Sequence, residues 1–146
     1  MIPFLVLVAA TLVLRGAGAV GVQMFESWTV CLRAGLCLMF LMTASAHWGR
    51  RRQDLIAMVP AAFPNPGLIV TITGILELLG AVGLQVRPVA PVAAVCLALL
   101  LMAMFPANVR AAREHLRIGT TAATPLVPRT ILQIVFIAAL IAAGLD

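Results

Sequence analysis

Glu77 is the residue of this sequence most able to do chemistry, because it interrupts the apolar run TITGILELLGAVGL (Thr71–Leu84) near its centre. A bare carboxylate in such surroundings is too costly, so it must bind a proton or find a partner. On a helix, Gly74, Ala81 and Leu84 fall on the same side as Glu77. Small residues allow two helices to approach closely, so we expect Glu77 to face another helix and not lipid.

Two arginines in other apolar segments are candidates for its partner. We call the end of a segment that is expected to face away from the cytoplasm its outer end. At 1.5 Å per residue, Arg33 lies about 7 Å below the outer end of its segment, and Glu77 lies about 13 Å below the outer end of its own. We therefore expect an Arg33–Glu77 ion pair, while Arg15 either joins it or extends to the headgroups. Two interpretations of Glu77 stay open: a contact that only fixes helix register, or a ligand or proton site.

Three further polar residues lie at the borders of apolar segments or within them. His47 ends the second segment, where a histidine interacts favourably with the negative end of the helix dipole. Asn108 follows Pro106, and we expect it to bond backbone carbonyls that a proline kink frees. Gln133 lies in the last segment and is expected to hydrogen-bond across the helices.

The sequence shows no nucleophile–base pair, no glycine-rich phosphate loop and no metal-ligand spacing. Its two histidines, His47 and His115, belong to different elements. The cysteines, Cys31, Cys37 and Cys96, lie inside apolar runs and form no Cys-x-x-Cys pair, which argues against zinc and thiol–disulfide chemistry. We expect no metal, and whether the protein is an enzyme stays open, with a non-catalytic role favoured.

The elements that must position these residues are long and apolar. Of 146 residues, 63% are hydrophobic and 10% charged, with a mean hydropathy of +1.12, whereas soluble domains carry about a quarter charged residues. Backbone polar groups in lipid must be satisfied within each segment, so an all-α polytopic membrane protein is expected. Five segments are long enough, or nearly so, to cross about 30 Å of hydrocarbon: Pro3–Val22, Trp28–His47, Gly67–Val86, Pro88–Pro106 and Pro128–Leu145.

Arginines predict the orientation of these segments. The net charge of +5 is carried without lysine, and arginines cluster after the second segment (Arg50–Arg52) and after the fourth (Arg110 to Arg129). Such connections are typically cytoplasmic. We therefore expect the N-terminus inside and the C-terminus outside, and a basic surface that meets membrane lipid and not nucleic acid. Arg15 interrupts the first segment, which favours a retained membrane helix over a signal peptide.

Local signals predict where helices begin and end. Asn65 is expected to cap the third segment and Asp54 to cap a brief interfacial helix before it. Pro106 is expected to end or kink the fourth segment, followed by a helical turn or two. There Glu114 lies four residues after Arg110, so an ion pair is available.

Four stretches together resemble the DoxX-like family of small bacterial integral membrane proteins: LRAGLCLMFLMTASAHW, MVPAAFPNPGLIVTITGILELLGAVGL, MFPANVRAAREH and PRTILQ. The resemblance covers Leu32 to about Ala143. It implies a protein of the bacterial inner membrane with one membrane domain over residues 1–146, a four-helix transmembrane bundle in 28–145 and an added N-terminal transmembrane helix in 3–22. Matching motif positions are occupied by His47, Pro60, Pro64, Gly74, Glu77, Gly80, Pro106, Asn108, Arg129 and Gln133.

The resemblance implies an accessory or binding role, because related members are associated with quinone-linked sulfur oxidation, oxidative-stress complexes and, in distant animal relatives, receptor assembly. We expect an accessory or partner subunit of a redox or stress-related membrane complex that packs against other membrane proteins or its own copies. Arg33, Glu77 and His47 would hold its helices in register. The alternative is a binder or enzyme for a lipophilic small molecule, such as a quinone or isoprenoid, or for a bound lipid. In that case Glu77 would handle a proton, and Arg33 would tune the pKa of Glu77.

Overall fold

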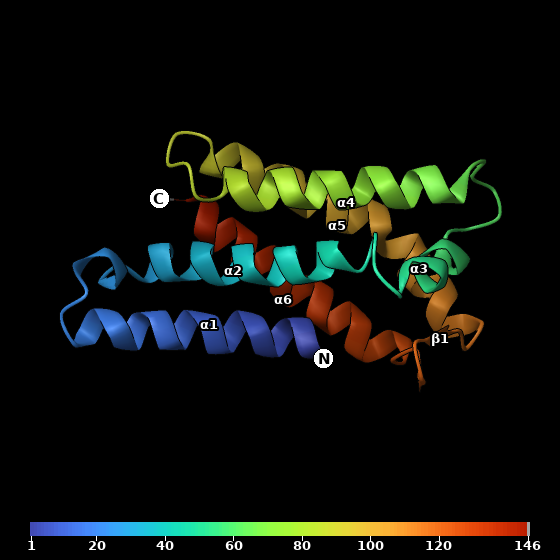
Figure 1. Cartoon of the computed structure of the whole chain (residues 1–146), viewed down its shortest axis with the longest axis horizontal. Coiled ribbons are helices and arrows are strands. Elements are labelled where there is room, and N and C mark those ends of the chain that lie inside the picture. The colour runs from blue at the N-terminus through green and yellow to red at the C-terminus, as the bar shows by residue number, and fades with distance from the viewer. Residues whose placement is uncertain (146) are drawn as a thin grey trace.

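The computed structural model describes residues 1–145, and the long elements of this part of the chain are all helices (Figure 1). Five of these helices are long and apolar enough to cross a membrane, which confirms the predicted helical architecture with five candidate spans. Their bounds are α1 (Ile2–Ala19), α2 (Trp28–Ser45), α4 (Pro66–Gly83), α5 (Ala90–Arg113) and α6 (Leu126–Gly144). The shorter elements are η1 (Gln23–Phe25), α3 (Arg52–Met58), β1 (Arg117–Ile118) and β2 (Thr121–Ala122).

Helix α2 is central to the packing, because it contacts α1, α4 and α6, while α5 contacts α4 and α6. Successive long helices run in opposite directions, so the connections gather at two ends (Figure 1). We call the end that holds α3 and the β1–β2 hairpin the α3 end, and the other the opposite end. The turn between α1 and α2 extends beyond α4 at the opposite end (Figure 1).

Small residues set the distance between α4 and its neighbours. Gly74 and Ala81 are buried on the same face as Glu77, as predicted from their spacing, and Gly80 is buried beside them. A Cβ atom added at Gly80 would lie 2.5 Å from side-chain carbons of Leu97, so α5 approaches the α4 backbone directly. Glycine at this position therefore permits the close approach of two helices.

Pro106 does not end its helix, because α5 continues through it to Arg113. A proline within a helix removes one backbone donor and disturbs the preceding turn. In that turn the Gln133 Nε2 atom donates to the carbonyl of Leu101 at 3.1 Å, which confirms the predicted bond across the helices. A helix of 24 residues spans about 36 Å, more than the thickness of the hydrocarbon core.

Helix α3 is tied to the ends of α2 and α4 by Arg52. Its guanidinium donates to the carbonyls of His47 (2.7 Å) and Gly67 (3.0 Å) and to the hydroxyl of Thr71 (3.0 Å). The predicted cap by Asp54 is wrong, because Arg51 occupies the N-cap position of α3. The Asp54 carboxylate accepts instead from the Gly119 amide in the hairpin at 2.8 Å.

Other local predictions have mixed outcomes. Asn65 occupies the N-cap position of α4, as predicted, with a left-handed φ of 56°, but its side chain makes no capping hydrogen bond. The ion pair between Arg110 and Glu114 is confirmed, at 3.0 Å on the surface. Arg110 also donates to the carbonyl of Val59, which ties α5 to the chain that follows α3.

Candidate functional site

A cavity of about 590 Å³ lies at the α3 end of the long helices, and we call it the Glu77 cavity. Four of the seven predicted site residues line it: His47 at the end of α2, Glu77 from α4, Asn108 from α5 and Arg129 from α6. Much of the remaining wall is apolar, including Met39, Phe40, Met42, Leu101, Met104 and Phe136. The structure therefore brings together polar residues that lie up to 82 positions apart in the chain.

Glu77 is 3% exposed and is held by a hydroxyl, not by a guanidinium. The Thr43 Oγ1 atom on α2 donates to Glu77 Oε2 at 2.8 Å. This bond satisfies one carboxyl oxygen without cancelling a charge. The remaining polarity of Glu77 is therefore available to whatever occupies the cavity.

The predicted Arg33–Glu77 ion pair is wrong: among residues 1–145, no ion pair joins these two side chains. The Gln85 Nε2 atom donates to the carbonyl of Arg33 at 3.0 Å, so Arg33 lies level with the residues that follow α4. Glu77 is eight residues further toward the α3 end, about 12 Å at 1.5 Å per residue. The prediction failed because it placed the outer ends of the two helices level with each other.

Arg33 binds the packed helices at the opposite end. Its side chain is 6% exposed, and its Nε atom donates to the carbonyl of Ala143 in α6 at 2.8 Å. Arg15 also lies outside the Glu77 cavity. Its guanidinium carbon is 5.3 Å from the centre of the Trp28 ring, a cation–π distance. Both arginines therefore connect α2 to neighbouring helices and take no part in lining the cavity.

His47 is fixed between α2 and α4. Its side chain is 3% exposed, and its Nδ1 atom lies 3.3 Å from the carbonyl oxygen of Thr43. A Cβ atom at Gly74 would lie 2.7 Å from the Cβ of His47, so only glycine lets the two helices approach here. Burial lowers the pKa of His47 below its ordinary value.

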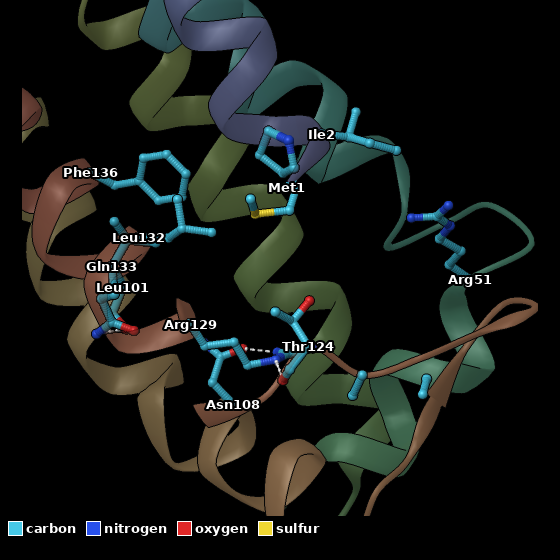
Figure 2. A pocket seen from close by; sticks show the side chains of 13 residues that line it. Met1, Ile2, Arg51, Leu101, Asn108, Thr124, Arg129, Leu132, Gln133 and Phe136 are labelled. Carbon is cyan, nitrogen blue, oxygen red and sulfur yellow. Dashed lines mark hydrogen bonds between the residues drawn. The ribbon is translucent and has the colours of Figure 1, made fainter. Parts of the chain in front are cut away.

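Asn108 and Arg129 form the polar floor of the cavity. The Arg129 Nη1 atom donates to Asn108 Oδ1 at 2.7 Å, and its Nε atom donates to the carbonyl of Thr124 at 2.9 Å. Asn108 thus accepts from an arginine, where we had expected it to bond carbonyls freed by Pro106. Both bonds are drawn in Figure 2, on the wall of a hollow of about 350 Å³ that shares Asn108 and Arg129 with the Glu77 cavity.

This second hollow extends toward the start of α1. Met1 and Ile2 lie across from Phe136 and Leu132 in Figure 2, and Arg51 projects from the chain that precedes α3. Arg51 also lines the Glu77 cavity, together with Arg50. The rim at the α3 end is therefore cationic.

A third hollow, of about 370 Å³, lies between α3, α4 and α5. It shares His47, Leu55, Met58, Met104 and Asn108 with the Glu77 cavity, so these side chains stand between the two spaces. Its other lining residues are almost all apolar, with Thr73 the exception. Phe63 on its border is 53% exposed, which opens this hollow to the surroundings of the helices.

The polar groups of the cavity stand at two depths. Gly80 packs against Leu97, so Glu77 lies about level with Leu100 in the antiparallel α5. Asn108 is eight residues further along α5, about 12 Å away along the helix axis. A carboxyl at one depth and an arginine–asparagine pair at the other, with apolar walls between them, suit a molecule that has both polar and apolar parts.

Thr43 and Arg51 are site residues that sequence reasoning missed. Thr43 lies four residues before His47 on α2, so the two share a helix face, and this spacing could have identified it. Arg51 was counted only as part of a basic surface. Within residues 1–145, no group of three His, Cys, Asp or Glu side chains is placed to hold a metal ion.

Comparison with known proteins finds one family. Residues 36–143 match the model of a domain of unknown function, DUF8561. No curated protein and no solved structure matches the chain. The matched range contains all four predicted residues of the Glu77 cavity and most of α2, whereas α1 precedes it.

Proposed function

The chain belongs to the family of the domain of unknown function DUF8561, and we propose that it binds a lipophilic small molecule in the Glu77 cavity. In this proposal the protein is a multi-pass protein of the bacterial inner membrane. Helices α2, α4, α5 and α6 form a four-helix core, and α1 is an added helix against α2. The α3 end, with the N-terminus, faces the cytoplasm because arginine-rich connections favour that side.

The observation that carries this proposal is a carboxyl group that is 3% exposed but lines a cavity of about 590 Å³. Ionisable groups at membrane depth are costly and are functional candidates by default. A role in helix register alone would need a firm partner on a neighbouring helix, and the partner present is one neutral hydroxyl, from Thr43. The cavity volume also lies in the usual range for small-molecule sites, about 300–1,000 Å³.

The walls of the cavity suggest what kind of molecule fits. Methionine side chains adapt to irregular apolar shapes, and Met39, Met42 and Met104 line the space between Glu77 and Asn108. A quinone or an isoprenoid has the required combination of a polar end and an apolar chain. Glu77 would then donate a hydrogen bond or a proton to the polar part of the ligand, or accept one from it.

Three sequence-based expectations stay predictions: the accessory role in a redox or stress-related complex, the assembly with other membrane proteins or with its own copies, and the relationship to the DoxX-like family. A ligand site is compatible with each of them. The cavity favours the binding role, because an accessory subunit would not need a buried carboxyl beside an internal space.

Native mass spectrometry of the purified protein tests the proposal. We expect wild-type protein to carry a lipophilic molecule at a stoichiometry of about one. Glu77→Gln should keep the fold, because an amide can still accept from Thr43, but should lose most of this ligand. Glu26→Gln is the matched control, because Glu26 is exposed and lies between α1 and α2, outside the cavity.

Two results would contradict the proposal. One is full occupancy in Glu77→Gln, which would leave Glu77 a structural role. The other is a wild-type protein that carries no small molecule but co-purifies with a second membrane protein, which would support the accessory role instead.

A further inference from the structure

The charges around the Glu77 cavity are unequal. Three arginines, Arg50, Arg51 and Arg129, line it, and Glu77 is the one acidic residue among its lining residues within the described chain. A general basic surface at the α3 end accounts for Arg50 and Arg51, which are exposed. It does not account for Arg129, which is half-buried and fixed by two hydrogen bonds.

Arg129 is also unfavourably placed for the stability of its own helix. It is the fourth residue of α6, where the positive end of the helix dipole disfavours a cation. Its bonds within residues 1–145 involve Nε and Nη1, which leaves Nη2 for a ligand. A guanidinium held in this way is well suited to a carboxylate or phosphate group, which arginine recognises through several donors at once.

The apolar hollow between α3, α4 and α5 could hold the apolar chain of a ligand. It begins at His47, Met104 and Asn108, which it shares with the Glu77 cavity, and it opens beside the exposed Phe63. A head group bound at Arg129 could therefore extend an apolar chain past Met104 toward the lipid.

We propose that the ligand is a lipid-like amphiphile with an anionic head, held by Arg129 and Arg51, and an apolar chain in the hollow between α3, α4 and α5. This inference rests on the proposed function and names the ligand class of that same site. It predicts that head charge and chain both contribute to binding, at separate places in the structure.

Binding of palmitate, a carboxylate with a long chain, tests the head. We would measure it in phosphatidylcholine nanodiscs against methyl palmitate, its uncharged ester. We expect wild-type protein to bind palmitate about tenfold tighter than the ester. Arg129→Gln should abolish this preference and Arg129→Lys should retain part of it. Arg113→Gln is the matched control, because Arg113 is exposed at the end of α5 and lines none of the three hollows.

A second pair of variants tests the chain. Ile69→Trp fills the hollow between α3, α4 and α5 and should weaken palmitate binding about tenfold. Leu76→Trp is the control, because Leu76 is 46% exposed on the same helix and lines neither this hollow nor the Glu77 cavity. Acetate, the head without the chain, should not displace palmitate at millimolar concentration.

Each contrary outcome has a separate meaning. Equal binding of acid and ester, with no effect of Arg129→Gln, would overturn the anionic head while leaving a lipophile site intact. Displacement by acetate, or no effect of Ile69→Trp, would overturn the chain. A wild-type protein that binds neither palmitate nor its ester, and carries no native lipophile, would overturn the proposed function itself. Thermal unfolding of every variant identifies any that fail to fold.

Discussion

The two ends of this molecule differ in how their interior is packed and lined. Toward the opposite end Leu36, Leu84, Leu97 and Leu140 are at most 1% exposed and pack in one cluster, and the hollow of about 560 Å³ between α4 and α5 is lined by apolar residues. At the α3 end the same helices surround hollows of about 590, 370 and 350 Å³. Dense packing at one end can hold the helices in place while the other end keeps room for a ligand.

Each end also buries a charged residue, and the comparison shows that burial alone does not identify a binding site. Arg33 is 6% exposed and donates to a backbone carbonyl of α6 among packed helices. Glu77 is 3% exposed but lines a cavity and accepts from one hydroxyl. The residue that lines a cavity is the better candidate for function, because it can still form hydrogen bonds with a ligand there.

The largest effect should come from adding bulk at the packed end. Gly80→Leu forces a side chain against Leu97, so we expect a loss of about 3 kcal/mol in the free energy of unfolding. Gly16→Leu on α1 is the control, because a Cβ there meets nothing within 4 Å. Unfolding by detergent titration measures both. A Gly80→Leu variant as stable as Gly16→Leu would show that this end is not tightly packed.

An intermediate effect is expected when each of the two buried ionisable residues is replaced in turn by an uncharged one. Arg33→Met removes the charged donor to the Ala143 carbonyl and should cost about 2 kcal/mol of unfolding free energy. Glu77→Gln should change that quantity by less than about 1 kcal/mol, because its bond with Thr43 can persist. The same unfolding assay compares them. The distinction between the two residues fails if Glu77→Gln is the more damaging change.

The smallest effect concerns charge on the surface of the α3 end. Glu114→Gln breaks the ion pair with Arg110, in which the two side chains are 29% and 49% exposed. We expect a loss of about 0.3–0.5 kcal/mol at low salt and less at high salt. Unfolding at two ionic strengths measures it. A salt-independent loss of several kcal/mol would mean that this region is packed as firmly as the opposite end.

The sequence was sufficient to predict the helices and most of the site. Segments of about 20 apolar residues can only be helices in lipid, so the five segments were found within a few residues of α1, α2, α4, α5 and α6, apart from the C-terminal extension of α5. Polar residues inside such segments are rare, which made Glu77 and His47 candidates, whereas Asn108 was considered for its place after Pro106 and Arg129 through the family resemblance. The structure then placed all four on one cavity.

The contacts between helices could not be predicted in the same way. Apolar length does not fix how far one helix slides along another, and the bond from Gln85 to Arg33 reveals an offset that separates Arg33 from Glu77. The bond from Gln133 of α6 to the Leu101 carbonyl of α5 is a second contact that fixes how two helices lie against each other. Both bonds are tertiary contacts between residues at least 32 positions apart.

The position of Met1 has a practical consequence for anyone who labels this protein. Met1, Ile2 and Pro3 line the hollow that holds Arg129 (Figure 2), so a fluorescent protein or affinity tag joined to Met1 would crowd that opening. Helix α6 ends at the opposite end (Figure 1), far from α3. A fusion placed after α6 should leave the proposed ligand site undisturbed, so ligand binding by the two fusions would show whether the space beside Met1 must stay open.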